Sequence, residues 1–282
     1  MNPNYDKLNK NADLVRDILR IAGIRNNFFI AGGSVFSLIN NNSNYNDLDV
    51  YFYEEIDFSA LENIKLTSSA SVSVSKAAVT ITVGDYPQTI IQFLKISQGT
   101  PEEVFETFDI NHSKVAYTSD YKLIISENFS KEIDINFKLF STKTYFRYKK
   151  YLNKGSKDPD NRTLNKIIDF LVDDLFGFVR LFTYGEEDSQ QNHTNRKTKL
   201  CVLKTLDKKH FNHNLYNKIV QKYSELECLE IFKTLIYNFK ENLFFTSESD
   251  EFLLQFFLVS KKFTLTATQY QRLAEKYPEY LI

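Results

Sequence analysis

The chain has 282 residues, of which 43% are hydrophobic, enough for a buried core in one large or two small domains. Its formal net charge of −1 argues against a protein evenly coated with positive charge for binding nucleic acid. No apolar run approaches the roughly 18 residues that span a bilayer, and the first residues lack the basic and apolar regions of a signal peptide, so we expect a cytoplasmic protein with no membrane partner.

The chain opens with a predicted helix over residues 5–25, where apolar residues recur at helical spacing. Residues 28–31 then predict a short strand that leads into Gly32, Gly33 and Ser34, and residues 35–39 have the pattern of a buried helical turn. Glycines let the backbone approach a phosphate closely, and the free N–H groups at the start of a helix favour an anion. We therefore expect a phosphate cradle at these two glycines, with the serine hydroxyl as a further donor.

Two aspartates, Asp47 and Asp49, follow about a dozen residues later and lead directly into the apolar, β-rich residues 50–53. If they begin a strand, their carboxylates lie on one face, because alternate strand residues share a face. Two carboxylate oxygens converging on one point suit Mg²⁺ or Mn²⁺, since Mg²⁺ usually takes one or two carboxylates together with substrate phosphates. The alternative is a turn with two solvated aspartates.

The order of Gly32-Gly33-Ser34, a short helix and Asp47-Leu48-Asp49 resembles the nucleotidyltransferase superfamily of DNA polymerase β, poly(A) polymerases and CCA-adding enzymes. The resemblance implies that the glycine-serine turn holds a nucleoside triphosphate (NTP) and that the carboxylates bind two metal ions. It further implies transfer of a nucleotide to an acceptor hydroxyl, with an RNA 3′ end as one candidate.

The superfamily usually has a third carboxylate on a later strand. We expect strands near residues 71–75, 79–83 and 89–96, but the polar residue inside the last of these is Gln92, a neutral amide. Either two carboxylates suffice, or Asp109 completes the catalytic set. Asp109 would lie just past a helix that begins at Pro101, with Thr100 as the N-cap and Glu103 completing a capping box. The alternative is that Asp109 is a structural cap or turn residue.

Residues 105–117 and the basic segment 144–155 are similar to nucleotidyltransferase-like proteins encoded by phages and giant viruses. The formal net charge is +8 over residues 141–222, −6 over residues 1–140 and −3 over residues 223–282. Arg147 and Lys150 are candidates for binding the triphosphate or an acceptor strand. Aromatic residues interleaved with these cations favour nucleic-acid binding, but an amphipathic helix with its aromatic side chains in the core is equally compatible.

Together these patterns predict an α+β fold, in which a small mixed-sheet nucleotidyltransferase core is followed by a mostly α-helical domain. We place the catalytic domain at 1–140 and the helical domain at 141–282, with apolar helical stripes at 164–179 and 215–229, a polar loop at 184–199 and helices near 229–243 and 266–277. The favoured function is metal-dependent nucleotidyl transfer from an NTP. The alternative is a catalytically weak or inactive adaptor that binds a nucleic-acid-processing partner through its helical domain.

Overall fold

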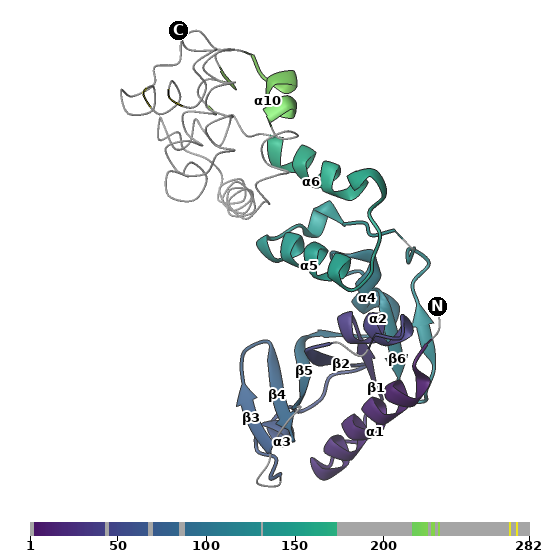
Figure 1. Ribbon diagram of the computed structural model, residues 1–282. Coiled ribbons are helices and arrows are strands. Elements are labelled where there is room, and N and C mark those ends of the chain that lie inside the picture. The colour runs from purple at the N-terminus through teal and green to yellow at the C-terminus, as the bar shows by residue number, and fades with distance from the viewer. Residues whose placement is uncertain are drawn as a thin grey trace. The chain divides into compact units, whose positions relative to one another are not determined.

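The computed structural model describes residues 3–42, 45–66, 70–84, 88–130, 132–173, 216–224, 227–228, 231, 271 and 275 (Figure 1). The chain forms two compact units, Met1–Asp160 and Asn161–Ile282. The helix at residues 142–153 therefore belongs to the same unit as the sheet. The assignment of a catalytic domain to 1–140 and a helical domain to 141–282 stays a prediction.

A seven-stranded mixed sheet forms the centre of the first unit, with strand order β3-β4-β5-β2-β1-β6-β7. The strands are β1 (Phe28–Ala31), β2 (Asp47–Phe52), β3 (Ala70–Val74), β4 (Ala78–Val83), β5 (Thr89–Gln98), β6 (Val115–Thr118) and β7 (Leu123–Ile125). β2 and β5 run parallel, and the other neighbouring pairs are antiparallel. The predicted α+β class with a mixed sheet is confirmed.

The helices of the first unit are α1 (Tyr5–Ile21), α2 (Gly33–Ile39), α3 (Ser59–Glu62), α4 (Pro101–Phe105) and α5 (Thr142–Asn153), together with the 3₁₀ turns η1 (Asn111–Ser113), η2 (Phe137–Leu139) and η3 (Pro159–Asn161). In the second unit, α6 (Arg162–Val172) buries the apolar stripe predicted from residue 164, and α10 (Tyr216–Lys222) lies within the predicted second stripe. The polar loop at 184–199 and the helix near 229–243 lie outside the described residues apart from position 231, and the helix near 266–277 lies outside them apart from positions 271 and 275.

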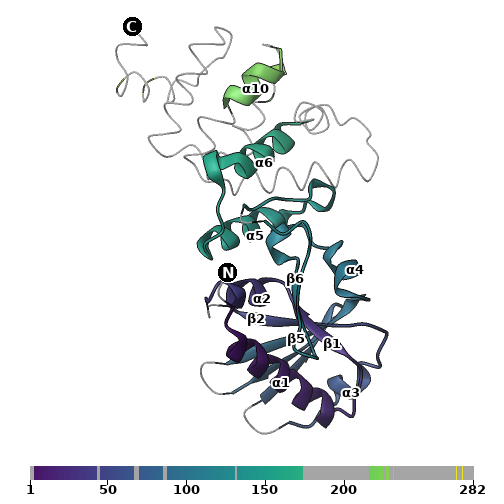
Figure 2. The same ribbon diagram turned by 90° about the vertical axis from the view of Figure 1, so that its right-hand side faces the viewer.

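Strand alternation divides the sheet into two differently covered faces. Leu48 and Val50 of β2 are fully buried, on the side where α1 and α2 pack (Figure 2). On the opposite face, α4 covers a cluster formed by Phe29, Ala31, Tyr51, Val104, Phe105 and Ala116. The aspartates of β2 share the face of Tyr51, so they lie beside this cluster and not within the core under α1.

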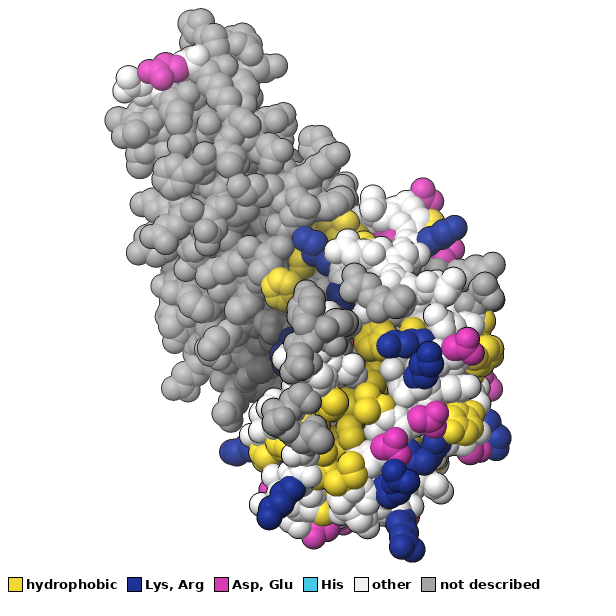
Figure 3. Space-filling model, turned by 60° about the horizontal axis from the view of Figure 1, so that its bottom comes forward, with side chains coloured by type: hydrophobic (Ala, Val, Ile, Leu, Met, Phe, Trp, Pro, Cys, Tyr) yellow, Lys and Arg dark blue, Asp and Glu magenta, His cyan; other side chains and the backbone are white. Residues whose placement is uncertain are grey.

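In the view of Figure 3, basic and acidic side chains of the first unit are interspersed around an apolar patch, and neither sign of charge forms a large patch of its own. Among the described residues, no helix combines the length and the hydropathy required to cross a bilayer.

The capping box predicted at α4 is present. Thr100 Oγ1 accepts a hydrogen bond from the Glu103 backbone N–H at 3.3 Å, and Glu103 Oε2 accepts one from the Thr100 backbone N–H at 2.8 Å. We expect Thr100→Ala to lower the free energy of unfolding by about 1 kcal/mol in urea denaturation, because it removes an N-cap acceptor. Thr100→Ser keeps the hydroxyl and serves as the control, and equal losses in the two variants would contradict this account.

Candidate active site

Asp47 and Asp49 lie on one face of β2, as predicted, and both line a pocket of about 450 Å³ in the first unit. Two independent registers fix the second aspartate, because its Cα is opposite Ala31 of β1 and Gln92 of β5. The pocket is lined by Gly32, Gly33, Asp47, Asp49, Tyr51, Gln92, Leu94, Ile96, Ser97, Thr107, Phe108, Asp109, Ser113, Lys143, Arg147, Lys150 and Tyr151. Most of the predicted site residues are thus brought to one place.

The glycine turn connects β1 to α2 at the edge of this pocket. Gly32 has φ +86° and ψ −145°, a conformation that only glycine adopts readily, and its N–H donates to the Val115 carbonyl at 3.1 Å. A Cβ at Gly32 would lie 3.7 Å from Oδ2 of Asp49. The turn therefore lies against the carboxylates, and the predicted phosphate cradle and the aspartates belong to the same pocket.

Electrostatic repulsion is concentrated at Asp49. Burial, and secondly the charge of Asp47, raises the pKa of Asp49 to about 7, and the positive charges of Lys150 and Arg147 offset this only in part. A carboxylate in this position holds its negative charge at a cost in free energy. Burial thus makes a negative charge on Asp49 unfavourable, and the neighbouring carboxylate of Asp47 adds to the effect.

Asp109 also lines the pocket, but its carboxylate is already engaged. Its Oδ2 accepts hydrogen bonds from Thr144 Oγ1 at 2.7 Å and from Arg147 Nη1 at 2.9 Å, and the residue is only 5% exposed. Within the described part of the chain, no group of three or more acidic, histidine or cysteine side chains is placed to hold a metal ion. Asp109 therefore fastens α5 to the sheet unit, in agreement with a structural role.

Gln92 occupies the strand position at which a third acid was sought. It lies beside Asp49 in the parallel β2–β5 register and lines the pocket. Leu94 and Ile96 follow on the same face of β5, and the Ile96 side chain is 72% exposed. These three lining residues carry no charge, so the positive charge of the pocket comes from other lining residues.

The positive charge comes from α5, on which Lys143, Arg147 and Lys150 are spaced at i, i+4 and i+7 and line the pocket together. The aromatic residues of this helix divide differently: Tyr145, Tyr148 and Tyr151 are buried, whereas Phe146 is 55% exposed. The tyrosines therefore pack in the core, as in the alternative of an amphipathic helix, and do not form a stacking surface for bases. The cations face the pocket.

Lys154, just past α5, does not line the pocket but bonds to the glycine turn at its edge, a contact that was not predicted from the sequence. Its Nζ donates to the Gly33 carbonyl at 2.9 Å and to Ser37 Oγ at 2.8 Å. Burial, and secondly the positive charge of Lys150, lowers the pKa of Lys154 to about 8. The spacing of 143, 147, 150 and 154 continues one helical face and was the available signal.

Ser34 differs from the prediction in its surroundings. The residue is 4% exposed, does not line the pocket, and its Oγ has no hydrogen-bond partner in the part of the chain that the structure describes. A buried hydroxyl without a partner is uncommon in proteins and often marks a functional position. The assignment of Ser34 to phosphate binding stays a prediction.

Residues 6–135 match the family described as Gabija anti-defense 2 family protein. No curated protein matches the chain. The matched stretch contains both aspartates of β2, the glycine turn and Asp109, and it ends before α5 begins.

Among solved structures, the chain is similar to a tRNA-processing enzyme complex, with 14% identity, a TM-score of 0.35, and coverage of 93% of this chain and 73% of that one. The chain is also similar to a CCA-adding enzyme with CTP, with 11% identity, a TM-score of 0.39, and coverage of 97% of this chain and 69% of that one. A third similar structure is the CCA-adding enzyme of Thermotoga maritima complexed with tRNA, with 12% identity and a TM-score of 0.36. The match covers 94% of this chain and 63% of that one.

The raised pKa of Asp49 predicts a pH-dependent penalty on folding. Because the native state holds this proton more tightly than the unfolded chain, stability falls as the pH rises from about 4 to about 7, by roughly 1.4 kcal/mol at most per unit of raised pKa. Asp49→Asn removes the penalty, so thermal denaturation in EDTA should show a higher Tm than the parent at pH 8 and a smaller difference at pH 5. Glu55→Gln, an exposed control, should show neither effect. An Asp49→Asn protein that melts below the parent at pH 8 would contradict the electrostatic account.

The two glycines of the turn should differ in their tolerance of alanine. Gly32→Ala forces a side chain into a positive-φ conformation and should lower the free energy of unfolding by about 1–3 kcal/mol. A Cβ at Gly33 would make only ordinary contacts, 3.5 Å from Lys154 Nζ and from the Tyr151 hydroxyl, so Gly33→Ala should cost less. Chemical denaturation of both variants tests the order, and a larger loss at Gly33 would refute it.

Proposed function

We propose that this protein is a metal-dependent nucleotidyltransferase of the cytoplasm that transfers a nucleotide from an NTP to an acceptor hydroxyl. The observation that carries the proposal is the meeting of Asp47, Asp49 and the Gly32-Gly33 turn in one pocket, opposite the cationic face of α5. In this reaction the acceptor oxygen forms a bond to the α-phosphorus, the bond from that phosphorus to the β-phosphate oxygen breaks, and pyrophosphate leaves.

The residues of the pocket fit a divalent cation. The carboxylates of Asp47 and Asp49 offer oxygen ligands on one strand face, and a bound cation would offset the burial and the charge of Asp47 that raise the pKa of Asp49. Mg²⁺ or Mn²⁺ bound there would supply a Lewis acid for the acceptor oxygen and for the phosphates. We assign these two aspartates as the ligands and leave Asp109 out of the ligand set, because it is already paired with Arg147.

The chain's own groups bind and orient the triphosphate in this proposal. Gly32 and Gly33 present a turn without side chains, which lets phosphate oxygens approach the backbone. Lys143 and Lys150 project from α5 into the pocket and attract the same oxygens. Arg147 has a double role, because its guanidinium holds Asp109 while lining the pocket.

A nucleic-acid end, such as an RNA 3′ hydroxyl, is the acceptor that we favour. The lysines on one face of α5 suit a phosphate backbone, and the exposed Phe146 lies next to Arg147 in the same helix. A polymer acceptor also agrees with the surplus of eight positive charges over residues 141–222.

One observation favours a second candidate, an adaptor of low or no catalytic activity. The carboxylate of Asp109 is bonded to Thr144 and Arg147, and Gln92 occupies the strand position of a third acid. An adaptor that acts on a partner protein would also agree with the anti-defense description of the matching family. In that case the pocket would bind a nucleotide without transferring it.

A labelled-nucleotide assay tests the enzyme. The full chain is incubated with each labelled NTP, Mg²⁺ or Mn²⁺, and separate pools of RNA and of protein. We expect label to enter the RNA pool, and the Asp47→Asn/Asp49→Asn double variant to lose at least about a hundredfold of this activity, because it removes the proposed metal ligands. The Glu54→Gln/Glu55→Gln variant makes the same charge change at exposed positions after β2 and should keep full activity.

The outcomes separate the two candidates. Label in the protein pool would retain the enzyme and replace the acceptor. NTP binding that needs the aspartates, without transfer to either pool, would favour the adaptor. Transfer that persists in the double aspartate variant would refute the proposed active site.

A further inference from the structure

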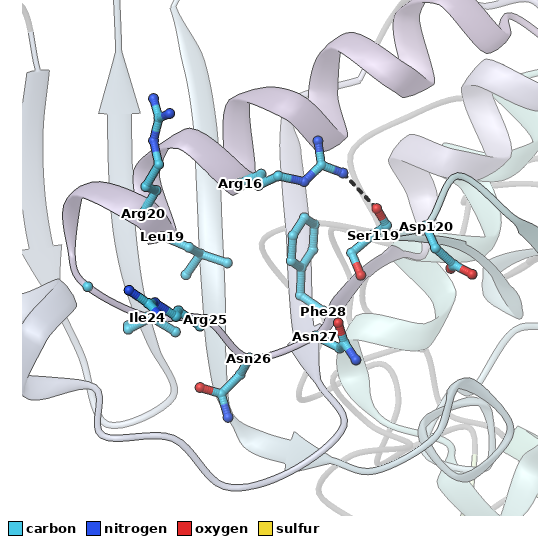
Figure 4. Close-up of a pocket in the computed structure, with 11 residues that line it drawn as sticks. Arg16, Leu19, Arg20, Ile24, Arg25, Asn26, Asn27, Phe28, Ser119 and Asp120 are labelled. Atoms are coloured by element: carbon cyan, nitrogen blue, oxygen red, sulfur yellow. Dashed lines mark hydrogen bonds between the residues drawn. The ribbon is translucent and has the colours of Figure 1, made fainter.

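A second pocket, of about 480 Å³, lies in the first unit at the opposite end of β1 from the glycine turn (Figure 4). β1 begins at Phe28, which lines this second pocket, and ends at Ala31, next to the turn of the first. The rest of the lining comes from the end of α1, the connection to β1 and the β6–β7 turn, as Arg16, Leu19, Arg20, Gly23, Ile24, Arg25, Asn26, Asn27, Ser119 and Asp120. None of these residues belongs to the proposed active site.

Three arginines and one acid line this pocket. The acid, Asp120, is paired with Lys122 at 2.7 Å. Two of the arginines are paired with acids of α1, Arg16 with Asp13 and Arg20 with Asp17, the latter at 3.1 Å on the exposed surface, where an ion pair contributes little. Arg25 is exposed and makes no hydrogen bond or ion pair with other described residues. Arg25 is thus the guanidinium most available to an anion, and Arg20 is a second, held only by a weak surface pair.

Arg16 has a different task. Its Nη2 donates to the Ser119 carbonyl at 2.6 Å and its Nη1 donates to the Tyr121 hydroxyl at 2.8 Å, which fastens the β6–β7 turn to α1. Figure 4 shows this guanidinium turned toward Ser119, with Arg20 and Arg25 on the other side of Leu19 and Phe28. The pocket therefore has a fixed polar end and a cationic end.

The end of α1 does not oppose an anion here. The last-turn carbonyls of a helix carry partial negative charge. In this helix, the Leu19 carbonyl accepts from the Ile24 N–H at 2.9 Å and the Arg20 carbonyl accepts from the Gly23 N–H at 3.1 Å, with Gly23 at φ +74°. This closure satisfies the carbonyls within the chain.

Between the two ends, the pocket has apolar and amide groups. Leu19 and Phe28 lie at its base, each 2% exposed, and Asn26 and Asn27 border it with side-chain amides, of which Asn26 Nδ2 donates to Glu54 Oε1 at 3.3 Å. An asparagine amide can pair with the edge of an adenine through its donor and acceptor together. The volume is in the range of small-molecule sites, about 300–1,000 Å³.

We propose that this second pocket binds a nucleoside monophosphate, either free or as the 5′ end of a strand, at a site separate from the active site. The phosphate is bound by Arg20 and Arg25, whose forked donors match phosphate oxygens, and the base lies over Leu19 toward the asparagine amides. This binding site is additional to the proposed catalytic function, and its existence does not depend on that function.

Calorimetric titration of the full chain with AMP in EDTA tests the site. We expect AMP to bind and adenosine to bind at least about tenfold more weakly, since charged hydrogen bonds to the phosphate are lost. Inorganic phosphate should compete, and a 5′-phosphorylated dinucleotide that competes better than AMP would identify a strand end as the source of the phosphate. Arg25→Gln should weaken AMP binding about tenfold.

Two matched variants make the result specific. Lys7→Gln makes the same charge change near the other end of α1, and Lys76→Gln makes it at an exposed position between β3 and β4, so both should bind AMP as the parent does. Equal binding of adenosine and AMP, an unaffected Arg25→Gln protein, or a loss of binding in Lys76→Gln equal to that in Arg25→Gln would each overturn the proposal. Because the assay contains EDTA and measures no transfer, an inactive first pocket would leave this result unchanged.

Discussion

The alternation of side chains along β2 is the constraint on which the site depends. Leu48 and Val50 are fully buried on one face, so the residues between and before them must project to the other. A shift of one residue would place two carboxylates in the core under α1 and α2, at a large cost in free energy. The hydrophobic core thus forces Asp47 and Asp49 into proximity despite their repulsion, and burial together with this repulsion raises the pKa of Asp49.

The opposing charges come from one helix that is itself fastened by an acid. Asp109 accepts from Thr144 and Arg147 near the start of α5, and Lys154 donates to the Gly33 carbonyl just after its end. These two attachments set the axial position of α5 and hence the direction of Lys150 toward the pocket. An acid considered in the sequence either as a catalytic or as a structural residue and a lysine overlooked there therefore act as a pair that orients the cationic helix α5.

Local patterns made much of this fold predictable. The capping box at Thr100, the apolar run after Asp49 and the helical face of Arg147 and Lys150 each depend on residues a few positions apart. The partners of Asp109 and Lys154 were not predictable, because they join positions 35 to 121 residues apart whose proximity exists only after the sheet has formed. For the same reason, the charge of α5 could be counted in the sequence, but the burial of its tyrosines could not.

The family match ends between the acidic and the basic residues of the pocket. Residues 6–135 include the aspartates, the glycine turn and Asp109, whereas Lys143, Arg147, Lys150 and Lys154 come afterwards. The acidic half of the pocket is thus encoded in the segment shared with that family, and the basic half in a helix outside it. Substitutions on one short helix can therefore change the positive charge of this pocket without altering any acidic residue of the matched segment.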